Sequence, residues 1–132
     1  MLFKKVKEIK SKEGVLHFRR WRILWTPWFT INIHGIYHHD EDEHLHSHPW
    51  NFISLVLRGS YTEKLESGAK LRYPGNVEKR TKDVFHKILA LHSKSVYTVN
   101  LMWGAEEGNW GYKVDGKYVD HKTYRDQKRI KK

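Results

Sequence analysis

The sequence predicts an all-β fold, either a sandwich or a barrel built from many short strands. β-Branched and aromatic residues recur in short runs, turn residues separate these runs, and outside the charged ends no ten-residue stretch shows a helical period. Many short strands at this spacing are typical of sandwiches and barrels. The predicted strands cover residues 15–25, 28–37, 50–58, 60–66, 84–91 and 95–103.

Turn residues mark the ends of these strands. Asp115-Gly116, between GYKV and KYVD, is the clearest two-residue hairpin signal, because both residues tolerate the positive φ of the tight hairpin turn. Arg58-Gly59-Ser60 lies between two strongly predicted strands. We therefore expect the chain to fold back there, so that strand 50–57 pairs antiparallel with 60–66.

Length and charge bound the organisation of the chain. At 132 residues it fits one domain, 1–132. The net charge of +10 is concentrated in a basic N-terminal segment of about residues 1–14 and a basic C-terminal segment of about residues 121–132. Such ends can attract nucleic acid by counterion release, but we favour solvated, frayed termini that keep the protein soluble. No nucleic-acid-binding signature accompanies them, so we do not expect nucleic acid as a partner.

Several classes of site and location are excluded by composition. The chain has no cysteine, so disulfides, thiolate metal sites and a cysteine nucleophile are impossible. A transition metal would have to use His, Asp, Glu or Tyr. No apolar run approaches a membrane span and no secretory signal is visible, so we expect a cytoplasmic protein without a membrane partner.

Histidines are concentrated in one segment. The chain has ten, and five fall in the run HHDEDEHLHSHPWNF. If this run is a strand, His44, His46 and His48 point to the same face, where their nitrogens can converge on one ion with a third ligand from a neighbouring strand. A histidine-rich surface patch beside an acidic loop explains the run equally well.

The spacing that follows the cluster resembles the first motif of the cupins, which is H-x-H, three or four residues, Glu, six residues, Gly. Here His46-x-His48 is followed after three residues by Phe52 and after six more by Gly59. Farther along, Pro74-Gly75 and then His86 in DVFHKI resemble a degenerate second motif, which in cupins brings a histidine to the same metal.

The longer string HPW-x-F-x-S-x-V-L-x-G-x-Y-x-E is similar to a group of small bacterial and phage cupins, over about residues 26 to 112. The resemblance implies a cupin-type jelly-roll β-barrel that holds one divalent transition metal, Fe, Mn, Ni or Zn, on His46, His48 and His86. It also implies a homodimer, because cupins often dimerise. It does not imply one activity, because the cupin fold includes enzymes and non-catalytic binders.

The sequence departs from the cupin pattern where Phe52 replaces the motif's glutamate, because phenylalanine cannot bind a metal. In the expected hairpin, Ser54 lies opposite Glu63 and Val56 opposite Tyr61. Because Ser54 shares the strand face of His46 and His48, Glu63 and Tyr61 should face the same interior. Glu63 is then a candidate fourth metal ligand or general acid–base, with a solvent-facing position at the barrel mouth as the alternative. Tyr61 is a candidate proton donor to a bound oxygen.

Other residues are weaker candidates. His34 shares a strand face with polar residues and either approaches the metal or is an ordinary hydrogen-bonded histidine. We assign His92 and His121 to the surface. Large aromatic side chains are candidates to line an apolar pocket above the metal: Trp50, Phe52, Tyr97, Trp103 and Trp110.

Three functions fit the sequence. The first is a metal-dependent enzyme, an oxygenase, isomerase or lyase that acts on a small polar molecule, because three neutral imidazoles leave coordination positions open. The second is a non-catalytic cupin that binds a small molecule or has a regulatory role, which the missing glutamate favours. The third is a nucleic-acid-associated accessory protein, supported only by the basic ends.

Overall fold

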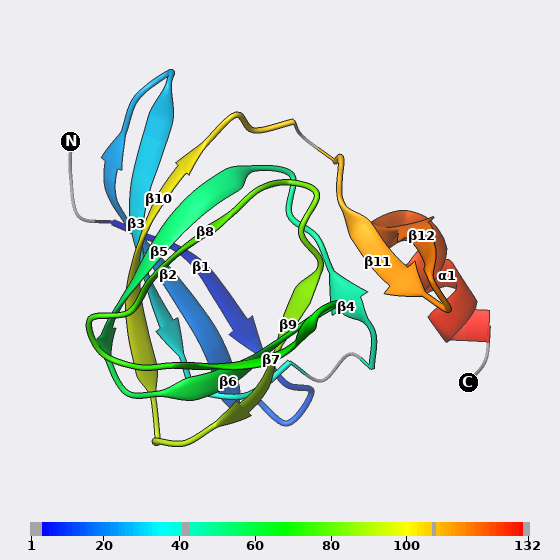
Figure 1. Ribbon diagram of the computed structural model, residues 1–132, viewed down its shortest axis with the longest axis horizontal. Helices are drawn as coiled ribbons and strands as arrows, with labels where there is room; N and C mark the ends of the chain where they lie inside the picture. The colour runs from blue at the N-terminus through cyan, green and yellow to red at the C-terminus, as the bar shows by residue number, and fades with distance from the viewer. Residues whose placement is uncertain (1–3, 41–42, 107, 131–132) are drawn as a thin grey trace.

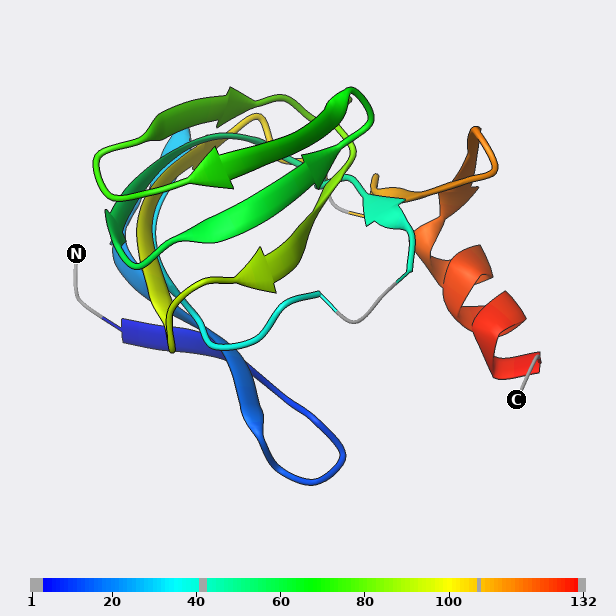
Figure 2. The same ribbon diagram turned by 60° about the horizontal axis from the view of Figure 1, so that its bottom comes forward.

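The structure, a computed structural model, describes residues 4–40, 43–106 and 108–130, with the side chains of 128–130 left aside. Two antiparallel six-stranded sheets curve around a common interior (Figures 1 and 2). The first sheet has the order β1 (Lys4–Lys10), β2 (Leu16–Trp25), β3 (Phe29–Ile36), β10 (Val96–Trp103), β5 (Asn51–Arg58) and β8 (Val77–Arg80). The predicted all-β, two-sheet architecture is therefore confirmed.

The second sheet has the order β12 (Lys117–Asp120), β11 (Gly111–Val114), β4 (Leu45–His46), β9 (His86–Leu91), β6 (Tyr61–Leu65) and β7 (Gly68–Arg72). The chain ends in α1 (His121–Ile130), which lies with β11 and β12 to one side of the barrel (Figures 1 and 2). Within the described residues, no helix has the length and apolar character needed to cross a bilayer.

All six predicted strands are present, each within two residues of its expected bounds. The predicted hairpin at Asp115-Gly116 is also confirmed. Val114 pairs with Lys117, and both turn residues have positive φ, +51° and +79°. This is the backbone that a two-residue turn of matching twist requires.

The expected hairpin between 50–57 and 60–66 is wrong. Strand β5 pairs with β10 and β8, whereas β6 pairs with β7 and β9 in the other sheet. Gly59 lies at this crossing with φ +79°, where an added Cβ would lie 2.2 Å from the Ser95 carbonyl oxygen. The glycine thus turns the chain from one sheet into the other instead of back along β5.

The preferred interpretation of both basic ends as frayed tails is also wrong, because residues 4–10 form β1 and residues 121–130 form α1, on which His121 and Tyr124 are buried. Strand β1 pairs with β2, and Glu8 accepts a hydrogen bond from Arg19 Nε at 2.7 Å. Strands β1, β7 and β8 were not predicted from the sequence, because charged residues dilute the β-branched signal in β1 and β8, and β7 (GAKLR) has no β-branched residue.

The side chains on the inner face of the first sheet change from apolar to polar along the strands. At one end, Ile36, Val56, Tyr61 and Val96 form a buried core, with Phe18, Ile88 and Leu91 packed against it. Next to it, the register aligns a row of side chains across four strands: Lys7, Arg20, His34 and Thr98. A second row consists of Arg22, Asn32, Asn100 and Ser54. The polar rows leave an interior that is not filled by hydrocarbon, and the site lies there.

Candidate metal centre

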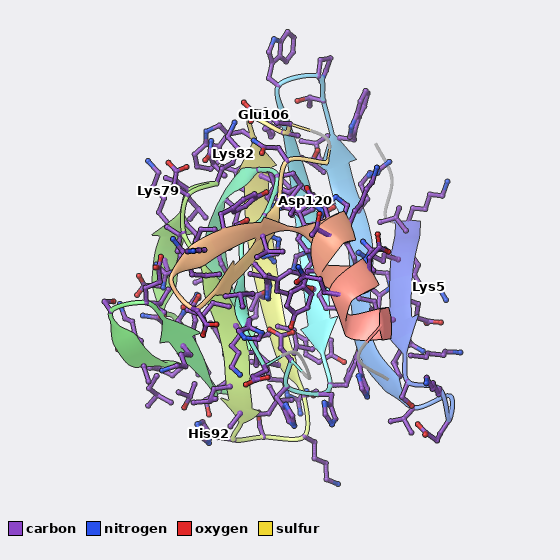
Figure 3. All side chains as sticks on the ribbon, turned by 90° about the vertical axis from the view of Figure 1, so that its right-hand side faces the viewer. Lys5, Lys79, Lys82, His92, Glu106 and Asp120 are labelled. Atoms are coloured by element: carbon purple, nitrogen blue, oxygen red, sulfur yellow. The ribbon has the colours of Figure 1, made fainter. Side chains whose placement is uncertain are left out.

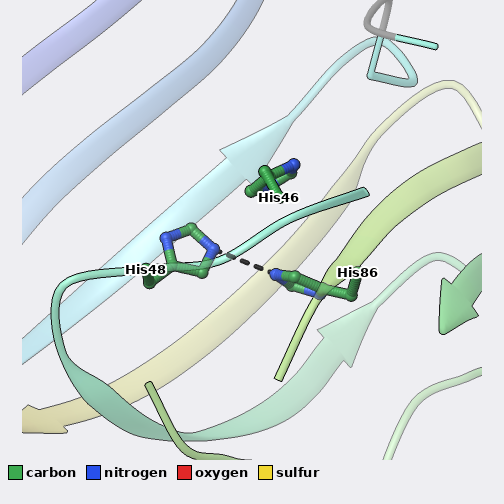
Figure 4. Close-up of side chains that lie close together, drawn as sticks. All are labelled: His46, His48 and His86. Carbon is green, nitrogen blue, oxygen red and sulfur yellow. Dashed lines mark hydrogen bonds between the residues drawn. The ribbon is translucent and has the colours of Figure 1, made fainter. Parts of the chain in front are cut away.

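Three histidines that are far apart in the sequence meet inside the barrel. His46 on β4 pairs with His86 on β9, and His48 follows β4 in the segment that leads into β5. One nitrogen of each ring lies within 4.8 Å of the other two, and His48 Nε2 is 2.9 Å from His86 Nε2 (Figure 4). The structure thus brings together the three histidines that the sequence analysis proposed as metal ligands.

Glu63 is not a member of this cluster and lies behind His86. Its Oε2 is 2.6 Å from His86 Nδ1. Burial alone raises the pKa of Glu63, but hydrogen bonds from His86 and Arg80 outweigh it and hold the pKa at about 2. Because an ionised carboxylate only accepts, His86 Nδ1 must donate, and in the neutral ring Nε2 keeps a lone pair directed at the cluster. A carboxylate in this position fixes the tautomer of a metal-binding histidine.

The carboxylate of Glu63 is held by a buried arginine. Arg80 donates from Nη2 to Oε1 at 2.7 Å and from Nε to Oε2 at 3.2 Å. Glu63 is 1% exposed, so the alternative of a solvent-facing residue at the barrel mouth is wrong. Both carboxylate oxygens are therefore already hydrogen-bonded within the protein.

Tyr61 faces the interior, as expected, although the hairpin that predicted this does not exist. Its hydroxyl oxygen accepts a hydrogen bond from Arg72 Nη1 at 3.0 Å, which leaves the hydroxyl proton able to be donated elsewhere. Burial raises the pKa of Tyr61 to about 12, so the phenol stays protonated at neutral pH. Arg72 also donates to the Ser54 carbonyl oxygen at 3.0 Å, which ties β7 to β5 across the barrel.

The histidines line a cavity of about 380 Å³, whose walls also include Trp50, Phe52, Tyr61 and Met102. Trp50 stacks on His48 with ring centroids 5.5 Å apart, and Phe52 meets the same ring edge-on at 5.4 Å. Phe52, which replaces the glutamate of the cupin motif, thus packs against a candidate ligand. This volume fits a small molecule.

The electrostatics keep His48 neutral. Burial lowers its pKa well below the usual value, and His86, His46 and Arg20 lower it further. His34 lies on the cavity wall with its pKa lowered by burial and then by Arg20 and Lys7, and its Nε2 accepts a hydrogen bond from Arg20 Nε at 3.0 Å. His34 is therefore a hydrogen-bonded wall residue and not a member of the three-histidine cluster.

Other candidates lie elsewhere. His44 does not share a face with His46 and His48, because its Nδ1 is 3.1 Å from the hydroxyl of Tyr124 on α1. His92 is exposed, as expected, but His121 is 8% exposed and stacks on Trp110, so its assignment to the surface is wrong. Among the proposed pocket aromatics, Tyr97, Trp103 and Trp110 do not line the histidine cavity.

The cationic side chains of this interior were not predicted from the sequence. Arg80 fixes Glu63, and Arg20 and Lys7 line the cavity. A signal was present in the alternation of β2, where Phe18 and Arg20 share one face and Arg19 points to the other. Arginine on the face that carries an apolar residue indicates a polar interior.

Solved structures with the same fold share little sequence with this chain. A cupin 2 conserved barrel domain protein from Rhodopseudomonas palustris aligns with TM-score 0.62 and 13% identity over 98% of this chain and 87% of its own. A cupin superfamily protein from Desulfitobacterium hafniense aligns with TM-score 0.54 and 10% identity, covering 72% and 83% of the two chains. The fold is a cupin jelly roll.

The crystal structure of FeII HppE aligns with TM-score 0.60 and 16% identity, and the alignment covers 74% of this chain and 56% of that one. No protein-family model and no curated protein matches the sequence. At these identities the likeness establishes the cupin fold, and the activity has to be argued from the site.

The donor set fits a divalent transition ion. Imidazole nitrogens bind such ions at about 2.1 Å, so two nitrogens on one ion are at most about 4.2 Å apart. The three nitrogens, each within 4.8 Å of the others, come close to this limit. Neutral imidazoles suit Fe, Ni, Cu and Zn, and three of them leave positions free for a ligand.

Proposed function

We propose that this protein is a metal-binding cupin in which His46, His48 and His86 hold one divalent transition ion that faces a small polar molecule in the cavity. The observation that carries the proposal is the convergence of the three rings together with the carboxylate of Glu63 on His86 Nδ1. In this proposal Glu63 orients a ligand and is not itself the fourth ligand.

A bound ion would polarise an oxygen of the small molecule. The chain's own residues would prepare that position. Arg80 holds the Glu63 carboxylate, and Glu63 holds the His86 ring in one tautomer. Trp50 and Phe52 pack on His48 and exclude water from one side, and the Tyr61 hydroxyl retains a proton for an oxygen in the cavity. These roles suit isomerase, lyase or oxygenase chemistry.

A non-catalytic small-molecule binder is the second candidate. It is favoured by Phe52 in place of the motif glutamate and by the engagement of both Glu63 oxygens with Arg80 and His86. A cupin enzyme that needs a free carboxylate beside its metal would not find one in this cluster. The two candidates share the metal site and differ in whether a bound molecule is converted there.

Elemental analysis of protein purified without an affinity tag tests the metal site. We expect nearly one transition ion per chain in the wild type and nearly none in the His46→Ala/His48→Ala variant. His92→Ala is the matched control, because His92 is exposed near the β9–β10 turn, where its Nε2 contacts Thr62 (Figure 3). Unchanged metal content in the double variant would refute the proposal.

A further inference from the structure

The cavity beside the three histidines has a cationic wall made by β1 and β2. Lys7 pairs in register with Arg20, Arg20 pairs with His34, and all three side chains line the cavity. Arg20 lies over the Trp50 ring, 5.3 Å from its centroid, and Trp50 also stacks on His48. The cationic wall and the candidate metal centre are therefore separated by one aromatic ring.

These cations lack anionic partners among the described residues. The one hydrogen bond that Arg20 makes there runs from Nε to His34, which leaves both Nη groups without a protein acceptor. Lys7 forms no ion pair with any described residue, although Glu8 beside it binds Lys5, Lys10 and Arg19 on the other face. Lys7 is exposed and Arg20 is half-buried, so the cost of holding a cation away from water without a counter-charge falls mainly on Arg20.

The pKa values of both cations are lowered accordingly. Burial lowers the pKa of Arg20 to about 10, with Arg22 adding to the effect, and burial together with Arg20 lowers the pKa of Lys7. Among the described residues, Asp40 is the one acid on the cavity wall, and its Oδ2 accepts a hydrogen bond from the Ile88 backbone. Within the described chain, neither Arg20 nor Lys7 forms an ion pair with Asp40 or any other carboxylate.

A second chamber, about 690 Å³, adjoins the first and shares Lys7, Arg20 and Trp50 with it. Among the described residues no acid lines it, and its walls also include Arg22 and the register partner of Arg22, Asn32. Arg22 Nε and Asn32 Oδ1 are both buried without a hydrogen-bond partner in the described structure. Unsatisfied buried polar atoms are rare, and here they lie next to the unpaired cations.

We propose that the ligand of this cavity is a small organic anion, whose carboxylate or phosphate is bound by Arg20 with help from Lys7. Arginine and lysine provide the charge-assisted hydrogen bonds that such a group needs. The inference rests on the proposed function in taking this cavity as the ligand site, and it adds the chemical class of the molecule. The rest of that molecule would pass Trp50 toward the three histidines.

Isothermal titration calorimetry with three probes tests the charge requirement. Benzoate carries a carboxylate, phenyl phosphate carries a phosphate, and benzamide is a neutral molecule of nearly the shape of benzoate. We expect at least one anion to bind with a Kd about ten times lower than that of benzamide. If neither anion binds better than benzamide, the inference is wrong.

Substitutions at the neighbouring positions Arg20 and Arg19 test whether Arg20 binds the anion. Arg20→Met should weaken anion binding about ten- to hundredfold, the range of a lost hydrogen bond to a charged group. Arg19→Met is the matched control, because Arg19 is on the same strand but points to the outer face, where it pairs with Glu8. Anion affinity that is unchanged in Arg20→Met overturns the assignment. Lys7→Met, with an expected smaller loss, provides the same test if Arg20→Met does not fold.

The His46→Ala/His48→Ala variant separates this inference from the metal site. If that variant contains no metal but still binds the anion through Arg20, both proposals hold. If wild-type protein contains no metal and the anion still depends on Arg20, only the metal proposal fails. If binding disappears in the double-histidine variant and is unaffected by Arg20→Met, the anion binds the metal alone and the present inference fails.

Discussion

Glu63→Gln tests whether the Glu63–Arg80 pair stabilises the fold as well as orienting His86. The substitution keeps the shape of the side chain and removes its charge. Glu63 is 1% exposed and Arg80 8%, with two hydrogen bonds between them, so in the variant the buried guanidinium keeps only its ion pair with Glu78, at 3.2 Å, as counter-charge. Breaking a buried ion pair in this way costs about 3–5 kcal/mol.

The amide oxygen of glutamine can still accept one of these hydrogen bonds, so we expect the lower end of that range, a loss of about 3 kcal/mol in the free energy of unfolding. For a chain of this length this corresponds to a fall in Tm of about 10 °C. The measurement is urea unfolding followed by tryptophan fluorescence, in EDTA so that metal does not contribute.

Glu66→Gln is the matched control for this experiment. Glu66 follows β6 and pairs with Lys113 at 3.6 Å, but its side chain is 52% exposed. Because exposed ion pairs contribute little, we expect a loss below about 1 kcal/mol. If Glu63→Gln is as mild as Glu66→Gln, the Glu63–Arg80 pair does not stabilise the fold and our argument from burial is wrong.

Two further predictions concern stability. The pKa of Tyr61 is raised from 10.0 to about 12 in the folded state, so the stability that the protonated phenol contributes is fully present below pH 10 and is lost as the pH rises toward 12. Between pH 9 and 11 the free energy of unfolding of the wild type should fall by about 1.4 kcal/mol more than that of Tyr61→Phe. Equal losses in the two proteins would contradict this. Gly59→Ala should cost more than Gly116→Ala, although both glycines have φ +79°, because a Cβ at Gly59 meets the Ser95 carbonyl oxygen at 2.2 Å whereas one at Gly116 meets open space. We expect about 1 kcal/mol for Gly116→Ala and more than about 2 kcal/mol for Gly59→Ala, and similar unfolding midpoints would contradict the expected clash.

Sequence patterns were reliable where a local rule decides the structure. The Asp115-Gly116 hairpin follows from residues that tolerate positive φ, and the six predicted strands follow from runs of β-branched and aromatic residues. The candidate ligands His46 and His48 come from a local spacing. Strands β1, β7 and β8 were missed because their stability comes from pairing with neighbours and not from their own composition.

The surroundings of the histidines, by contrast, were decided by tertiary structure. Gly59 directs the chain into the other sheet, so Glu63 faces Arg80 and His86 instead of pairing with Ser54. This contact between β6, β8 and β9 joins residues for which no sequence spacing specifies proximity.

The sequence by itself therefore determined an all-β chain with a histidine motif, because turn chemistry and strand composition act over a few neighbouring residues. Only the tertiary structure decided that Glu63 supports His86 from behind and that Arg20 and Lys7 face the cavity without an ion pair to any described residue. The physical reason is that charges pair only when their strands lie side by side in the right register, and strand order and register depend on residues that are far apart in the sequence.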